Sequence, residues 1–356
     1  MARRSKIVSP APPSLPDPIP ARKSRRLGLY APYVLLLAGV AVWSLFWVIA
    51  RNQASSRLDA AAQQLRAAGY EASWSERTVG GYPFRLDVTL TDARLRDPSG
   101  WEFETPRLEA EAYMHALGHW VMAAPQGLSF ARPRGGVVNV RGKLIQASLS
   151  QLDKTPPKFS FFGRKLVFAP AAGAQPFALS SADKVEMHLL SGPNDQGAVL
   201  LRVDDGKAGP SGLFARVAGD RPISLIWDST LTKMSAFKGP GWTNAARAWS
   251  QAGGQINVRQ AGVTAGDALI GVEPATLGVG FDGRLKGALD VSLKQAPRAF
   301  TALGQDGTLP PDVAAAAAAV AGVRQGNGDV ARAVLSFEAG RTTFGPVAIG
   351  PAPRAF

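Results

Sequence analysis

A run of uncharged residues, Leu27 to Ala50, constrains the fold of this chain more than any other feature. As an α-helix it would be roughly 36 Å long at about 1.5 Å per residue, enough to cross a hydrocarbon core about 30 Å thick. Tyr30 and Tyr33 lie near one end, and Trp43 and Trp47 near the other. Aromatic residues favour both membrane interfaces. The run therefore predicts a single transmembrane anchor.

The segment before this run predicts the orientation of the anchor. Residues 1–26 contain seven basic residues and one acidic residue, with a proline-rich stretch from Pro10 to Pro20. Basic residues beside a span stay on the cytoplasmic side. We therefore expect a cytoplasmic amino terminus, an inner-membrane anchor and a periplasmic body. The alternative is a cleaved signal, but the run is longer than a signal core and contains bulky tryptophans.

Composition excludes several classes of function. Cysteine is absent, which excludes disulfides, thiolate metal sites and cysteine nucleophiles. The net charge is +13, but outside the tail the basic residues are scattered and form no cluster with aromatic residues. A nucleic-acid partner is therefore not expected.

The chain after the anchor predicts one helix and then a β-rich body. Residues 51–69 place Leu58, Ala61, Ala62 and Leu65 on one helical stripe that ends at Gly69. Residues 70–356 consist mostly of short alternating runs separated by glycine and proline, which is typical of antiparallel sheet.

Few helices interrupt the alternating runs. We expect helices over residues 242–252 and 311–322, and hence an α+β, mostly β body with a few covering helices. Residues 153–180 are irregular and predict a long connection or a seam between two halves, 70–152 and 181–356.

Apolar residues on the early strands are the candidate binding residues. Phe84, Leu86, Val88 and Leu90 alternate with polar residues and should share one face. Two interpretations are open: a protein core, or an apolar groove for an acyl chain. The residues predicted for such a groove are Trp74, Phe84, Leu86, Val88, Trp101 and Phe103.

Catalytic and cofactor motifs are weak. Gly278, Gly280 and Gly283 match the spacing of a dinucleotide loop, but Asp282-Gly283 and the alternation that follows indicate a hairpin. His115 and His119 would be about 13 Å apart on a strand, too far to share a metal ion. The chain has three histidines and no G-x-S-x-G motif. We therefore expect no enzyme, no metal and no cofactor.

The order of motifs resembles a known type of protein. After the tail and the span come Gly69-Tyr70-x3-Trp74 and Gly80-Gly81-Tyr82-Pro83-Phe84-Arg85, and later Gly253-Gly254-Gln255-Ile256 and residues 275–293. This order resembles an uncharacterised family of single-span proteobacterial envelope proteins over most of residues 27–350. In style the chain is also similar to AsmA-type membrane-anchored β proteins, which are associated with lipid traffic. Neither resemblance implies a catalytic residue.

These observations predict two functions. The first is an envelope protein that binds lipid or another apolar ligand. The alternative is a scaffolding module that recruits a protein partner through its sheet edges.

Overall fold

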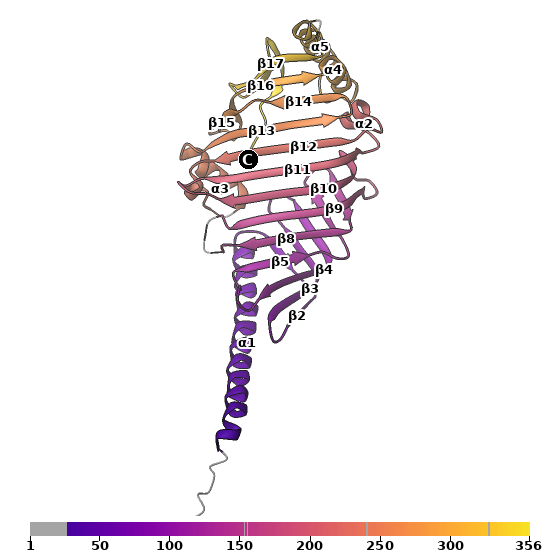
Figure 1. Cartoon of the computed structure of the whole chain (residues 1–356). Helices are drawn as coiled ribbons and strands as arrows, with labels where there is room; N and C mark the ends of the chain where they lie inside the picture. The colour runs from indigo at the N-terminus through magenta and orange to yellow at the C-terminus, as the bar shows by residue number, and fades with distance from the viewer. Residues whose placement is uncertain (1–26, 153, 155, 240, 327) are drawn as a thin grey trace, which may run out of the picture. The chain divides into compact units, whose positions relative to one another are not determined.

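A computed structural model describes residues 27–152, 154, 156–239, 241–326 and 328–356 (Figure 1). The predicted cytoplasmic tail, 1–26, lies outside the described residues. The chain divides into two compact units, one ending at Val48 and the other comprising residues 49–356.

The anchor and the predicted following helix form one element, α1 (Leu27–Ala67). Gly69 follows with a φ of 86°, a conformation that glycine adopts without strain, so the helix stops where the sequence predicts. The covered residues of α1 beyond the anchor recur every three or four positions, as expected for one helix face. They are Ala50, Ala54, Ser55, Leu58, Ala62 and Leu65. Ala61, predicted to join this stripe, is exposed.

One antiparallel sheet contains all the strands of the described residues, which confirms the predicted mostly β fold. The strands of its first half are β1 (Glu71–Ser73), β2 (Glu76–Gly80), β3 (Arg85–Arg96), β4 (Glu102–Tyr113), β5 (His119–Ala123), β6 (Leu128–Arg132), β7 (Gly136–Arg141), β8 (Leu144–Ser150) and β9 (Lys158–Pro170). Those of its second half are β10 (Leu179–Ser191), β11 (Gly197–Ala208), β12 (Ile223–Leu231), β13 (Gln255–Ala265), β14 (Ala268–Val272), β15 (Ala275–Val279), β16 (Leu285–Lys294), β17 (Val330–Glu338), β18 (Arg341–Phe344) and β19 (Val347–Pro351).

At two places in the sheet, two short strands pair with different parts of the same long strand. β4 pairs with β6 along one part and with β5 along another, and these lead through β7 and β8 to β9. β13 likewise pairs with both β14 and β15, which both continue to β16. From β9 to β13 each strand pairs with the next in the chain.

The helices of the body occupy the strand ends and one end of the sheet. They are α2 (Leu213–Ala218), the short 3-10 turn η1 (Met234–Ala236), α3 (Gly241–Gln251), α4 (Ala296–Gln305) and α5 (Pro311–Gln325). In Figure 1, α3 and α2 lie at opposite ends of the central strands, and α4 and α5 lie beside β14 to β17. The sequence predicted α3 and α5, but not α2 and α4.

The main core lies where α4 and α5 cover β16, β17 and β18. Ala317, Ala321 and Ala331 are fully buried there, and Phe300 of α4 contacts Phe344 with ring centres 4.8 Å apart. The alanine face of α5 permits this close approach because alanine adds little bulk. Smaller clusters lie under α2 and around β7, β8 and β9.

The predicted seam at residues 153–180 is instead occupied by strand β9, which pairs with β8 on one side and β10 on the other. The strands of 70–152 and 181–356 therefore belong to one continuous sheet. The alternation fails here because Phe161 and Phe162 are adjacent and Lys165 has a left-handed φ of 51°. Such a residue interrupts the period of two that identifies a strand.

Candidate ligand-binding face

One side of the sheet is apolar from β2 to β17. Residues directly opposite each other on neighbouring strands share a face. Followed from strand to strand, the pairing produces a central row without a polar side chain: Val79, Val88, Ala110, Met122, Ala147, Phe161, Met187, Leu201, Trp227, Ala261, Val272, Val291 and Ala333. We call this side of the sheet the apolar face.

Two flanking rows widen the apolar face. The first contains Ile145, Gly163, Val185, Val203, Leu225, Val263, Ile270, Leu293 and Ala331. The second contains Trp120, Leu149, Phe159, Leu189, Val199, Ser229, Val258 and Ala275. Its one polar member, Ser229, accepts a hydrogen bond from Nε1 of Trp227 at 2.9 Å. The face is therefore apolar over three rows.

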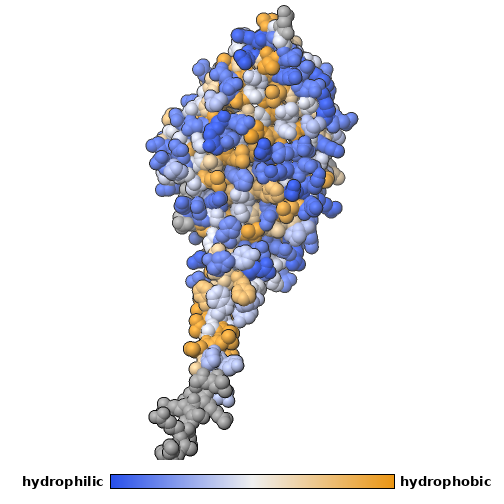
Figure 2. Space-filling view, viewed as in Figure 1, coloured by the Kyte–Doolittle hydropathy of each residue, from blue (hydrophilic) through white to orange (hydrophobic). Residues whose placement is uncertain are grey.

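The opposite side of the same strands is mostly polar. A row beginning at Asp87 continues through Glu111, Val121, Ser148, Ser160, His188, Leu200, Asp228 and Gln260. Nδ1 of His188 lies 2.9 Å from Oγ of Ser160, so this half-buried histidine has a structural hydrogen-bond partner. Figure 2 shows hydrophilic side chains over much of the visible surface of the body.

Both ends of the apolar face are covered by helices. Arg77 pairs with Leu90 and therefore lies on the apolar side, where its guanidinium binds Asp59 of α1 at 2.6 Å. The last turns of α1 thus cover β2 and β3, and Leu86 is only 1% exposed. At the far end, α2, α4 and α5 pack on Ile223, Leu293 and Ala331.

The middle of the apolar face is left partly open. On β5, β8, β9, β10 and β11, the side chains of the central row and of the second flanking row are half-buried, except that Met187 is 39% exposed. Phe161 packs against the core cluster around β7, β8 and β9, which also contains Ile145 of the first flanking row. The other residues of the central and second flanking rows on these strands belong to no core cluster of the described residues. We define the open strip as Trp120, Met122, Ala147, Leu149, Phe159, Met187, Leu189, Val199 and Leu201. These strands lie about 4.8 Å apart, so the strip is about 19 Å long across the sheet.

In the structure, the residues predicted for an apolar groove lie at different places in the fold. Leu86 and Val88 are on the apolar face and buried. Phe84 lies in the turn before β3, where it is 70% exposed, rather than in the strand. Trp74 lies between β1 and β2, half-buried, with the guanidinium of Arg77 6.0 Å from its ring centre.

Trp101 lies in the β3–β4 connection and Phe103 lies at the start of β4, and they are 44% and 52% exposed. The ring of Phe103 lies 6.4 Å from that of Phe130 on β6. The candidate residues therefore do not form one groove, and their role in ligand binding stays a prediction. The partly open part of the apolar face lies on later strands.

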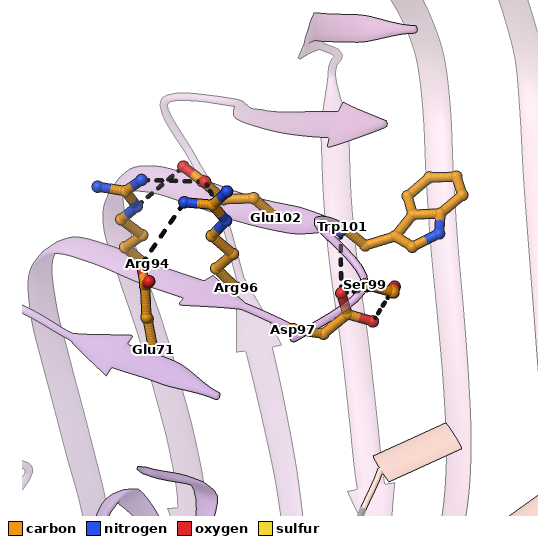
Figure 3. A network of polar contacts seen from close by, with 7 residues as sticks. All are labelled: Glu71, Arg94, Arg96, Asp97, Ser99, Trp101 and Glu102. Carbon is orange, nitrogen blue, oxygen red and sulfur yellow. Dashed lines mark hydrogen bonds and ion pairs between the residues drawn. The ribbon is translucent and has the colours of Figure 1, made fainter. Parts of the chain in front are cut away.

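Trp101 is presented by a tightly bonded turn (Figure 3). The carboxylate of Asp97 accepts hydrogen bonds from the hydroxyl of Ser99 at 2.7 Å and from the backbone N–H of Trp101 at 2.9 Å. Next to this turn, Glu102 binds Arg94 at 2.9 Å, and this contact raises the pKa of Arg94. In Figure 3 the indole of Trp101 points away from these ion pairs.

A cleft of about 760 Å³ lies beside Trp101. The start of α3 and the segment Arg354–Phe356 line its other side, and Nε1 of Trp242 donates a hydrogen bond to the carbonyl of Ala355 at 2.6 Å. The cleft thus brings together three segments that are far apart in the sequence: the β3–β4 turn, the start of α3 and the C-terminal residues. Trp242 in its lining is 58% exposed.

A small apolar cavity of about 80 Å³ lies between the apolar face and helices α2 and α4. Val263, Ile270 and Leu293 of the sheet line it, opposite Phe214 and Phe300 of the helices. The covered end of the face is therefore not completely filled.

The predicted anchor residues lie on α1, which is long and apolar enough to span a membrane. Tyr30, Tyr33 and Trp43 are 58%, 67% and 37% exposed, and Trp47 is half-buried. The ring of Trp43 lies 5.9 Å from that of Phe46. Hydrophobic side chains of α1 lie at the surface seen in Figure 2.

The glycine motif forms the predicted hairpin. β15 ends at Val279 and pairs with Leu285 of β16, and Gly283 has a left-handed φ of 77° in the turn between them. A strand follows the turn, whereas a dinucleotide loop requires a helix there. His115 and His119 are both exposed, and the described residues contain no group of three or more potential metal ligands.

Comparison with known proteins places the chain in a family. A family model described as "Uncharacterized protein conserved in bacteria (DUF2125)" matches residues 47–353. The chain belongs to this family. The predicted resemblance to an uncharacterised bacterial family is therefore confirmed. No curated protein and no solved structure matches the chain.

The continuous apolar face is the feature that the sequence of this DUF2125 member did not reveal. Alternation identified most of its strands one at a time, but not how they pair. One signal was present in the sequence: adjacent apolar pairs such as Phe161-Phe162, Leu189-Leu190 and Leu200-Leu201 lie in the strands of the open strip.

Proposed function

We propose that this protein is a membrane-anchored, non-catalytic lipid-binding protein of the cell envelope. Its apolar face would hold an acyl chain across strands β5 and β8 to β11. The anchor would lie in the inner membrane with the basic tail in the cytoplasm and the body in the periplasm, as the charge of residues 1–26 favours.

The central row of apolar residues is the observation that supports this proposal. A contiguous apolar patch that stays partly exposed on a folded domain typically marks a site where a ligand, a membrane or another protein binds. The open strip is about 19 Å long, and one leaflet of a hydrocarbon core is about 15 Å thick. One acyl chain therefore fits across the strands, and burying a leucine-sized group on it would contribute about 1.5–3 kcal/mol.

Neighbouring leucines on opposite faces provide a matched test. Leu201 is in the open strip, and Leu200 lies on the polar face next to Asp228 and His188; both are half-buried. A photoreactive phenylalanine analogue would replace each residue in turn in the full-length chain, expressed in bacterial membranes. After irradiation, the purified protein would be analysed by mass spectrometry for covalently attached lipid.

We expect lipid adducts at position 201 and several-fold fewer at position 200. Equal labelling at both positions, or none at position 201, would contradict lipid binding by the apolar face. A protein adduct at position 201 would instead favour the scaffolding alternative. The pair Leu189 and Leu190 repeats the test on the adjacent strand β10.

A further inference from the structure

The last turns of α1 run alongside β1 and β2 in the opposite direction. Arg66 near the end of α1 donates hydrogen bonds to the carbonyl of Ala72 at 2.6 and 3.0 Å. Five residues later in the chain, Arg77 binds the carboxylate of Asp59 and the carbonyl of Ser55. As the chain advances along β1 and β2, its partners therefore move back along α1 towards the anchor.

Extending this antiparallel arrangement of β2 and α1 places the end of β2 beside Ala50, the last residue of the uncharged run of α1. From Arg77 to the turn at Gly81 is about 13 Å along a strand, and from Asp59 to Ala50 is about 14 Å along a helix. The β2–β3 turn, residues 81–84, therefore lies level with Ala50. Ala50 is only 6% exposed, whereas its neighbour Ile49 is 50% exposed. This burial shows that the body packs on the helix at that level.

The β2–β3 turn carries exposed aromatic residues. Tyr82 is 50% exposed and Phe84 is 70% exposed. Tyr113 at the end of β4 is 52% exposed and lies next to them, since it pairs with Arg85 and the following N–H, of Met114, donates to the carbonyl of Phe84 at 2.9 Å. Tyrosine and phenylalanine exposed together are favourable in the interfacial region of a bilayer and unfavourable in water.

We propose that this aromatic group, Tyr82, Phe84 and Tyr113, inserts into the surface of the membrane that holds α1. The uncharged run ends at Ala50 and Arg51 follows, so the bilayer surface lies at the level of the turn. The covered end of the apolar face at β3 then lies next to the lipid surface, and the open strip begins two strands further along the sheet, at β5. This inference rests on the proposed membrane anchoring and lipid binding.

The absence of native cysteine makes a direct depth measurement straightforward. Single variants Phe84→Cys and Phe281→Cys of the full-length protein would carry a nitroxide label, in nanodiscs of phosphatidylethanolamine and phosphatidylglycerol. Electron paramagnetic resonance would compare collision of each label with oxygen and with a water-soluble nickel complex. Phe281 is the matched control, an 81% exposed phenylalanine in the β15–β16 turn.

We expect the label at position 84 to collide several-fold more with oxygen than with nickel, and the label at 281 to show the reverse. Equal, nickel-dominated values at both positions would overturn the proposal. Low collision with both reagents at position 84 would indicate protein contact there and would also overturn it.

A third label and the crosslinking test separate the possible failures. Leu35→Cys, at a residue 73% exposed on α1, should report the bilayer interior whenever the anchor spans it. A water-exposed label at position 84 with a buried label at 35 and lipid adducts at 201 would refute only the contact by the turn. Absence of adducts at 201 with a membrane-embedded label at 84 would refute only lipid binding.

Discussion

The covered end and the middle of the apolar face differ although both are built from the same alternating strands. At β16 and β17, helices α4 and α5 bury Leu293 and Ala331 in the main core. At β10 and β11, no helix in the described part of the chain forms a core cluster with Met187 and Leu201, and these two residues stay partly exposed. The pleat thus places apolar residues on one side, but only the covering helices turn that side into a core. An apolar row in a sheet can therefore be a core at one end and a binding surface in the middle.

The largest expected effect tests whether only the covered end acts as a core. Phe344, which is 1% exposed, and Phe159 of the open strip would each be replaced by alanine. Loss of a buried phenylalanine costs about 3–5 kcal/mol, so F344A should lower the free energy of unfolding by that amount. F159A should lower it by less than half as much, as measured by denaturant unfolding in detergent. Equal losses would show that the middle is packed like the end.

A charge in the open strip should weaken lipid binding without unfolding the protein. Leu201→Lys loses a contact worth about 1.5–3 kcal/mol, which corresponds to about tenfold or more in lipid affinity and lowers the amount of lipid that co-purifies. Leu200→Lys, on the polar face, should leave occupancy unchanged. Lipid co-purified with each variant would be quantified by mass spectrometry. If both variants lose lipid equally, the apolar face is not the binding surface.

The cavity of about 80 Å³ at the boundary between the two regions allows a gain in stability. Ala299 of α4 lines it, and Ala299→Leu would place additional apolar atoms there. We expect stabilisation of about 1 kcal/mol, because each buried methylene contributes about 0.8 kcal/mol and some strain offsets this. Thermal unfolding would measure the change. A clear loss of stability would show that the cavity cannot accept side-chain volume.

The smallest expected effect concerns the turn that joins the two middle strands, β10 and β11. Asp195 in this turn accepts hydrogen bonds from Oγ of Ser235 at 2.8 Å and from its N–H at 2.6 Å. These bonds lower the pKa of Asp195 below its ordinary value of 3.8. Because the folded state binds the proton less tightly, the stabilisation is complete above that value and is lost as the pH falls below it.

Asp195→Asn should therefore lower Tm slightly at pH 6, and the difference from the unsubstituted protein should shrink towards pH 3. Asp220→Asn, at an exposed carboxylate, is the control. A constant difference between pH 3 and pH 6 would mean that the charge of Asp195 does not stabilise this turn.

Local rules predicted the elements whose signals lie within a few residues. The anchor, the stop at Gly69, helices α3 and α5 and the Asp282-Gly283 hairpin all follow from apolar run length, glycine and proline position, and periodicity. Helix α2 was missed because six residues are too few to show a period. Strand β9 was missed because Lys165 breaks its alternation.

The candidate site could be predicted only in part. Leu86 and Val88 were correctly placed on an apolar face, but Phe84 was assigned to the strand that it precedes. The partial exposure of Met187 on β10 and of Leu201 on β11 could not be predicted from the sequence. Either strand, taken alone, does not show whether a helix covers it, because covering depends on contacts between segments far apart in the chain.

The sequence by itself determined that this chain has one apolar span and a body of alternating strands, because hydrophobic length and the two-residue period are local properties. Only the tertiary structure decided which residues form one row. Strand register aligned Val88, Met122, Phe161 and Leu201 on a single side. Helix placement then buried the two ends of that side and left its middle open, because a sheet face becomes a core only where another element packs on it.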